Sequence, residues 1–163
     1  MKVTKVNFYG DMYYVFDVQV NTGIVKMRCR ADYVGDEDDY FVVMIDRYRF
    51  ESLWYKLNDS TVPHLARGTV EAWKTDDNYT SADEGFSFSI DSPVPLAEVK
   101  SVNDFINGYT RTIWLMANGA KQFPVYVYDR VTAEELLQSV GVKGSQCYSN
   151  RDLHKLTNNE VKI

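Results

Sequence analysis

Hydrophobic and polar residues alternate along the N-terminal part of the chain, as expected for strands that bury one face. Turn signals at Gly10-Asp11 and Asn21-Thr22-Gly23 divide this region. A continuous apolar run follows further on, which is typical of a strand buried on both faces. The pattern therefore predicts an antiparallel meander and then a buried strand, over residues 3–9, 12–20, 24–30 and 40–45.

The pattern then changes to a helical period. Phe50, Leu53, Trp54 and Leu57 fall at i, i+3, i+4 and i+7 behind Asp46, which is a suitable N-cap. A short helix is predicted over 63–73, and the polar stretch 75–92 is predicted to be a long loop with a brief strand at 86–90.

Residues 93–141 read as a strand, turn, helix, strand and helix unit. Pro93 and Pro95 favour an extended edge segment, and Phe105-Ile106 begin a second short strand. Asn107-Gly108 forms a turn before a helix predicted over 109–118, which Gly119 ends. A strand over 123–128 and a helix with a capping box at Thr132 and an end at Gly141 complete the unit. The tail, 142–163, is expected to be mobile apart from one helical turn near 151–156.

A polar cluster stands where the helix after Asn107-Gly108 begins. Backbone N–H groups at a helix start are unsatisfied and carry partial positive charge, so they attract phosphate or carboxylate. Gly108 permits close backbone approach, Thr110 offers a hydroxyl and Arg111 offers a charged fork. The alternatives are an ordinary turn at Asn107-Gly108 and a surface Arg111 paired with Glu98 or Asp104.

The length and net charge of the chain limit the number of domains and the kinds of partner that we expect. A chain of 163 residues without a linker or repeat fits one α+β domain, and the net charge of −5 argues against coating of nucleic acid. Acidic residues gather in two stretches, 32–39 and 75–99, and the second contains no Lys or Arg. These stretches are solvated loops, a surface for a basic partner, or a decoy that resembles DNA in its charge.

Cysteine, histidine and hydrophobic segments exclude several kinds of site. Cys29 and Cys147 are far apart and only His64 and His154 accompany them, so neither a zinc site nor a Cys–His nucleophile pair is expected. No signal segment and no membrane span is predicted, which leads us to expect a cytoplasmic protein with free thiols.

Three segments in order resemble the ParB/sulfiredoxin superfamily. Gly108-Tyr109-Thr110-Arg111 is similar to its Gly-x-x-Arg at a helix start, Phe123-Pro124-Val125 to its later strand, and Val94-Pro95-Leu96 to the strand that opens the fold. With its β-rich N-terminal part, the chain looks most like the plasmid fertility inhibition factors of the Osa/FiwA type. The resemblance implies a mixed sheet with flanking helices, preceded by the meander.

The resemblance also implies chemistry. It suggests a protein that binds ATP or another NTP with Mg²⁺, cleaves DNA at a local site and suppresses conjugative transfer. Nucleotide contacts would come from Asn107, Gly108, Tyr109, Thr110 and Arg111. DNA cleavage needs carboxylates that bind Mg²⁺ and a cation that stabilises the developing charge. The candidate carboxylates are Glu98 and Asp104, with Asp129 as a further metal ligand, and the candidate cation is Arg111. The alternative for each carboxylate is a strand end in solvent.

Departures from the superfamily limit these implications. Tyr109 stands where a sulfiredoxin needs Cys, which excludes sulfinic-acid reduction. Only Lys100 to Asp104 separate the first strand from the next, where ParB proteins place a helix, and no helix-turn-helix module follows Gly141.

Two functions therefore compete. One is an NTPase, and a metal-dependent DNase, at the Asn107–Arg111 turn. The other is a non-catalytic inhibitor that blocks a conjugation, DNA-processing or host-defence protein through an acidic and aromatic surface.

Overall fold

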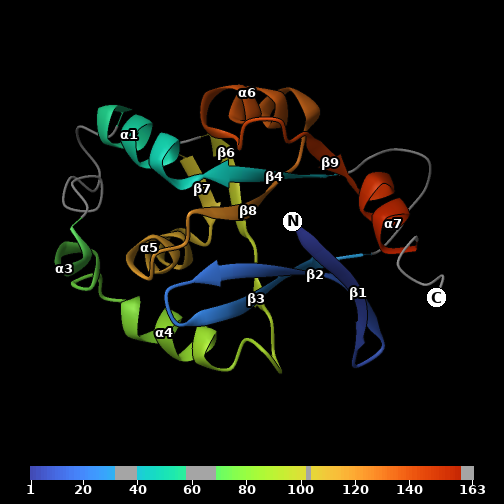
Figure 1. The fold of residues 1–163 in the computed structure, drawn as a ribbon, viewed down its shortest axis with the longest axis horizontal. Helices are drawn as coiled ribbons and strands as arrows, with labels where there is room; N and C mark the ends of the chain where they lie inside the picture. Colours follow the sequence, from blue (N-terminus) through green and yellow to red (C-terminus); the bar gives the residue numbers. More distant parts are fainter. Residues whose placement is uncertain (32–39, 58–68, 102–103, 159–163) are drawn as a thin grey trace.

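Two β-sheets and the helices around them form the part of the chain that the computed structural model describes, residues 1–31, 40–57, 69–101 and 104–158 (Figure 1). The first sheet has four strands in the order β1-β2-β3-β5, and the second has five in the order β7-β6-β8-β4-β9. Both sheets are mixed, because β5 runs parallel to β3 and β6 runs parallel to β8. The architecture is thus α+β, as the sequence predicts.

The strands of the first sheet are β1 (Lys2–Phe8), β2 (Asp11–Val20), β3 (Gly23–Arg30) and β5 (Val94–Pro95). Those of the second are β4 (Phe41–Asp46), β6 (Ala97–Ser101), β7 (Asp104–Asn107), β8 (Gln122–Val127) and β9 (Cys147–Ser149). Leu96 joins β5 to β6, so the chain passes here from one sheet to the other, and the Leu96 amide still donates to the Arg28 carbonyl of β3 at 2.8 Å.

Six helices are labelled in Figure 1: α1 (Arg47–Leu57), α3 (Val70–Trp73), α4 (Tyr79–Ser87), α5 (Tyr109–Ala117), α6 (Arg130–Val140) and α7 (Asn150–Asn158). Helices α1 and α6 contact each other and cover β4, whereas α5 contacts β6, α3 and α4. One cluster of buried hydrophobic residues runs from Val3 of β1 to Leu153 of α7. Within the described residues, no helix combines the length and hydrophobicity that a transmembrane span requires.

Most predicted elements are confirmed. The meander, the buried strand, the helix behind Asp46, the edge segment at Val94–Pro95, the helix that begins at Tyr109 and the strand after it are all present. Asp46 caps α1 as predicted, since its Oδ1 accepts hydrogen bonds from the amides of Tyr48 and Arg49 at 3.0 and 3.1 Å. Of the short helix expected over 63–73, the described part is α3, while 63–68 and the acidic stretch 32–39 lie outside the described residues.

Three predictions were wrong. The supposed loop 75–92 with a brief strand at 86–90 instead contains α4 followed by a turn, because Tyr79, Ala82 and Phe86 put an apolar stripe on a helix and are buried. The N-cap of α6 is Asp129 rather than Thr132, since the Asp129 carboxylate accepts from the Thr132 amide at 2.8 Å. The tail is more structured than expected over 142–158, because β9 pairs with β4, α7 packs against β1, and Leu153 of α7 is fully buried. Residues 159–163 lie outside the described residues.

Candidate functional site

The turn between β7 and α5 depends on Gly108. Its φ of +87° lies in the left-handed region that side chains disfavour. A Cβ atom at this position would lie 2.5 Å from the Ala97 Cα of the neighbouring strand and 2.8 Å from the Arg111 Nη2. Glycine is therefore required at position 108 both by the backbone conformation and by the close approach of β6.

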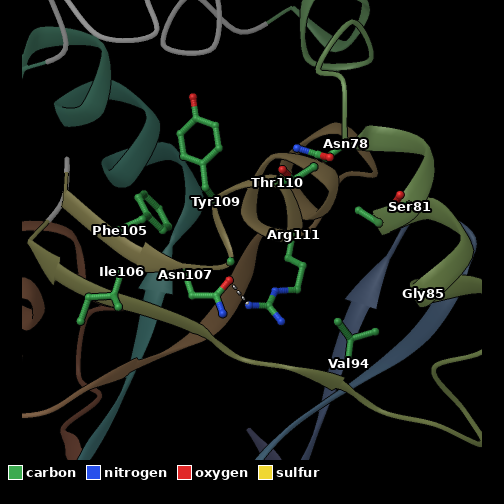
Figure 2. A pocket seen from close by; sticks show the side chains of 12 residues that line it. Asn78, Ser81, Gly85, Val94, Phe105, Ile106, Asn107, Tyr109, Thr110 and Arg111 are labelled. Carbon is green, nitrogen blue, oxygen red and sulfur yellow. Dashed lines mark hydrogen bonds between the residues drawn. The ribbon is translucent and has the colours of Figure 1, made fainter.

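Arg111 lies in the first turn of α5 and folds back toward β7 (Figure 2). Its Nη2 donates to the Asn107 Oδ1 at 3.2 Å. Burial lowers the pKa of Arg111, and the negative charge of Glu98 opposes that shift. The hydrogen bond that the structure gives this guanidinium thus goes to a neutral amide, rather than to Glu98 or Asp104.

The start of α5 leaves amides without helical partners. The Thr112 amide makes the first bond within the helix, to the Gly108 carbonyl at 3.0 Å, and no side chain caps the helix. The amides of Tyr109, Thr110 and Arg111 therefore make no bond inside the helix. These groups add partial positive charge beside the Arg111 guanidinium.

A cavity of about 480 Å³ opens at this helix start. One wall is the segment from Phe105 to Arg111, and the other is the missed helix α4 with Val94. Figure 2 shows Ser81 and Gly85 of α4, together with Asn78 at its N-cap, across the cavity from Arg111. This chain lacks the helix that ParB proteins place between the first strand and the next, and α4 forms a wall of the cavity here.

Helix α4 is held to α5 by polar and aromatic contacts. The Trp114 indole N–H donates to the Asp83 Oδ1 at 2.7 Å, and Phe86 stacks on Trp114 with ring centroids 4.1 Å apart. The Thr110 hydroxyl donates to the Asp76 Oδ1 at 3.3 Å just before α4. These contacts fix the distance between the two walls of the cavity.

Thr110 and Tyr109 are therefore placed differently from what their position in the motif suggests. The Thr110 hydroxyl is already engaged by Asp76, although the residue lines the cavity. The Tyr109 ring makes edge contacts with Trp54 and Phe105, at 5.6 Å in each case, and points away from Arg111 in Figure 2. Burial, and then the charge of Asp76, raise the pKa of the Tyr109 hydroxyl, which stays protonated.

The three predicted carboxylates do not come together. Glu98 pairs in register with Asn107 and its Oε2 accepts from the Tyr128 hydroxyl at 3.2 Å. Asp104 is opposite Ser101, at the other end of the β6–β7 pair, and Asp129 caps α6. Among the described residues no group of three His, Cys, Asp or Glu side chains is arranged to hold a metal ion. Of the three, Glu98 is the carboxylate whose negative charge raises the pKa of Arg111, against the effect of burial.

Sequence reasoning missed Asn78, Ser81 and Gly85 as cavity residues because it missed the helix that carries them. The signal was present in the spacing of Tyr79, Ala82 and Phe86, but the acidic and polar residues between them favoured a loop. It also missed Tyr128, which follows β8 and is hydrogen-bonded to Glu98.

Comparisons with known proteins agree with this architecture. A family model described as plasmid fertility inhibition factor matches residues 42–141. The protein Osa of Shigella flexneri is 33% identical over 111 residues, which cover 63% of this chain and 57% of that relative, so the match spans little more than half of the relative's length. A crystal structure of an oncogenic suppression activity protein, a plasmid fertility inhibition factor, has the same fold with a TM-score of 0.75 and 24% identity, over 99% of this chain and 85% of that one.

Proposed function

The chain belongs to the plasmid fertility inhibition factor family, and on that premise we propose that it suppresses conjugative DNA transfer and that its Asn107–Arg111 turn binds the phosphates of a nucleoside triphosphate. The proposal includes a ParB/sulfiredoxin type of core for residues 93–141, which the order of the strand, turn, helix and strand supports. The phosphate site at the start of α5 would be the centre of that core.

The observation that carries the proposal is the environment of Arg111. A guanidinium that loses solvent needs a negatively charged or strongly polar partner, because burial of an unpaired charge is costly. Here the bonded partner is the neutral Asn107 amide, and burial already lowers the pKa of Arg111. A phosphate in the cavity would add its charge to that of Glu98 and accept two parallel hydrogen bonds from the fork.

The other groups of the turn suit the same ligand. The free amides of Tyr109, Thr110 and Arg111 point out of the helix start, where phosphate oxygens are commonly bound. Gly108 has no side chain to obstruct them. Asn78 and Ser81 on the opposite wall add hydrogen-bonding groups for the rest of a nucleotide, and a cavity of this volume is large enough for such a ligand.

The positions of the carboxylates show which of them could bind Mg²⁺. Glu98, Asp104 and Asp129 do not fit a joint metal site, because no group of three such side chains among the described residues is arranged to hold a metal ion. Mg²⁺ is often bound by one carboxylate together with substrate phosphates, and Glu98 beside Arg111 fits that more modest arrangement. The ion would neutralise phosphate charge there, while Arg111 stabilises charge on the transferred group.

Nucleotide binding can be tested with a variant that keeps the volume of the arginine stem. We expect ATP, CTP or GTP with Mg²⁺ to raise the melting temperature of the wild-type protein, and Arg111→Met to abolish that rise together with any turnover. The melting temperature without nucleotide should change little, because Arg111 forms a hydrogen bond to Asn107 rather than an ion pair.

Arg130→Met is the matched control, since Arg130 occupies the first turn of α6 and its side chain is 66% exposed. It should keep the wild-type nucleotide shift. Nucleotide binding is refuted if none of the three nucleotides shifts the wild-type protein, or if Arg111→Met responds as the wild type does.

A second function is favoured by a different observation. Phe88 and Ile90 are exposed beside acidic residues after α4, which supports a non-catalytic inhibitor that blocks a conjugation protein through its surface. In that case charge reversal at Asp77 and Glu84 would relieve inhibition of conjugation in a mating assay, and Arg111→Met would not.

A further inference from the structure

In the segment that follows α4, two large apolar side chains are exposed to solvent and a serine between them is buried. Phe88 and Ile90 are 67% and 56% exposed, whereas Ser89 between them is 1% exposed. Folding normally buries large apolar side chains and leaves serine in water. A pair of exposed apolar residues around a buried serine therefore needs an explanation other than the core.

Hydrogen bonds hold this segment in place. The Ser89 Oγ accepts from the Lys26 amide of β3 at 3.2 Å, and the Ser89 amide donates to the Phe86 carbonyl at 3.1 Å. The amides of Asp91 and Ser92 both donate to the Phe88 carbonyl, at 3.1 and 2.9 Å. The chain then enters β5, which pairs with β3. Phe88 and Ile90 are thus presented on a fixed backbone, which reduces the entropy cost of binding.

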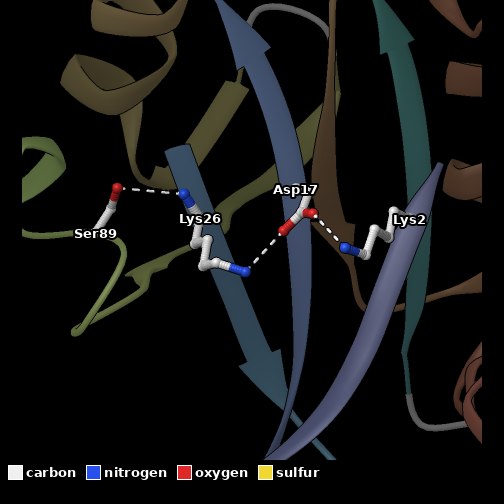
Figure 3. Close-up of polar contacts among 4 residues, drawn as sticks. All are labelled: Lys2, Asp17, Lys26 and Ser89. Carbon is white, nitrogen blue, oxygen red and sulfur yellow. Dashed lines mark hydrogen bonds and ion pairs between the residues drawn. The ribbon is translucent and has the colours of Figure 1, made fainter. Parts of the chain in front are cut away.

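The surroundings of the two apolar residues are acidic. Glu84 lies one helical turn before Phe88 and is exposed, as is Asp91 directly after Ile90. The nearby Lys26 does not offset them, because its Nζ is 2.9 Å from the Asp17 Oδ1 on β2, away from Ser89 (Figure 3). The same Asp17 carboxylate also holds Lys2 at 3.3 Å.

The other faces of α4 have separate roles. Tyr79, Ala82 and Phe86 belong to the hydrophobic core. Asn78, Ser81 and Gly85 line the Arg111 cavity. Glu84, Phe88, Ile90 and Asp91, which we name the Phe88 patch, belong to neither set.

We propose that the Phe88 patch docks a basic amphipathic segment of a partner protein. Exposed aromatic and aliphatic anchors surrounded by charge are typical of binding surfaces. The acidic rim selects a partner with lysine or arginine beside its apolar residues, since complementary charge favours encounter and like charge penalises it. This inference rests on the second function proposed above, the inhibitor that acts through its surface, and names the chemistry of its partner. It uses no residue of the phosphate site, because neither Phe88 nor Ile90 lines the Arg111 cavity.

A synthetic probe tests the surface directly. It is a fluorescein-labelled helical peptide of about 18 residues, with Leu at i, i+3, i+4 and i+7 and Lys at the remaining positions. Fluorescence anisotropy should show binding to the wild-type chain, and Phe88→Ser with Ile90→Ser should weaken binding about tenfold or more. Glu84→Lys with Asp91→Lys should weaken it about fivefold and reduce its dependence on salt.

Matched controls make the result specific. Val131→Ser, which removes an apolar side chain of equal 67% exposure from α6, should leave peptide binding unchanged. The Phe88→Ser, Ile90→Ser variant should keep the wild-type melting temperature and nucleotide response, because neither residue is buried or lines the cavity.

Several results would overturn the proposal. One is equal binding of a control peptide with Ser in place of every Leu, and another is unchanged binding by the Phe88→Ser, Ile90→Ser variant. Sedimentation showing a wild-type dimer that this variant loses would assign the patch to a second copy of the chain. Patch-dependent binding to phosphatidylglycerol vesicles would assign it to a membrane surface instead.

Discussion

Gly108 determines the shape of the candidate site through its backbone alone. Its positive φ lets the chain turn from β7 into α5, and the missing Cβ lets β6 and the Arg111 side chain approach. Arg111 can then reach Asn107 on the preceding strand and remain inside the cavity. The position of the Arg111 side chain therefore depends on the glycine at position 108.

Replacing Gly108 tests this dependence. Gly108→Ala should lower the free energy of unfolding by roughly 1–3 kcal/mol, because the left-handed conformation is strained for alanine and its Cβ would clash with Ala97. Urea unfolding followed by circular dichroism measures the change, and nucleotide should no longer shift the melting temperature.

Gly85→Ala provides the comparison. Gly85 is inside α4, and its nearest neighbour would be the Val94 Cγ2 at an ordinary 3.9 Å. Alanine should therefore stabilise the protein by about 0.5–1 kcal/mol through helix propensity. Equal effects of the two substitutions would show that the Gly108 conformation is not what the structure indicates.

At the scale of elements, Asp17 links three strands of the first sheet. It lies on β2 between Lys2 of β1 and Lys26 of β3, and its side chain is 12% exposed. Burial raises the pKa of Asp17, but the hydrogen bonds and charges of Lys26 and Lys2 outweigh burial and lower it overall. The carboxylate is therefore stabilised in the folded protein.

This arrangement predicts a dependence on pH. The pKa of the folded state lies below the unfolded value of about 3.9, so the contribution of Asp17 to stability is complete above about pH 5 and is lost as the pH falls through the folded pKa. Asp17→Asn should be less stable than the wild type at pH 6, and its free energy of unfolding should fall less steeply below pH 4. Urea unfolding at stepped pH measures both.

Asp11→Asn is the control on the same strand. Asp11 pairs with Arg30 at 3.4 Å, but both side chains are more than half exposed. Such surface pairs contribute about 0–1 kcal/mol, so this variant should follow the wild-type curve. A steeper acid response in Asp17→Asn than in the wild type would contradict the assignment.

At the scale of the whole molecule, the C-terminal segment joins the two sheets. Strand β9 extends the second sheet by pairing with β4, and α7 packs on β1 of the first. The Asn150 side chain accepts a hydrogen bond from the Tyr40 hydroxyl at 3.1 Å, and Leu153 enters the core. Residues 142–158 of the predicted mobile tail are thus packed against both sheets, and we expect them to unfold together with the rest of the protein.

Leu153→Ala tests the role of this segment. It should lower the free energy of unfolding by about 2–5 kcal/mol, the cost of a cavity in a packed core. Tryptophan fluorescence and far-UV circular dichroism should still report one coincident transition, because Leu153 shares a core with Trp54, Trp73 and Trp114.

Leu156→Ala on the same helix should cost far less, since Leu156 is 41% exposed. Loss of only a small part of the circular dichroism signal at low urea, with the fluorescence transition unmoved, would mean that α7 unfolds separately and that the two sheets do not need it.

Local patterns determined much of this protein from the sequence alone. The alternation of apolar and polar residues, divided by turn residues, predicted β1 to β3. Asn107-Gly108 before a helical run predicted the turn that holds Arg111. Both predictions succeeded because strands, turns and helix starts depend on residues that are neighbours in the sequence. The predictions from the sequence were wrong at α4 and at the C-terminal segment. Both are mostly polar, and their few buried residues are spaced for one face of a helix.

Only the tertiary structure decided what these elements build. It placed α4 across the cavity from Arg111, and it put Asp104 and Glu98 at opposite ends of the β6–β7 pair. It also left Phe88 exposed beside a buried Ser89. Each outcome depends on contacts between residues far apart in the chain, such as Ser89 with Lys26 and Asp76 with Thr110. Periodicity along one segment carries no information about which distant segment it will meet.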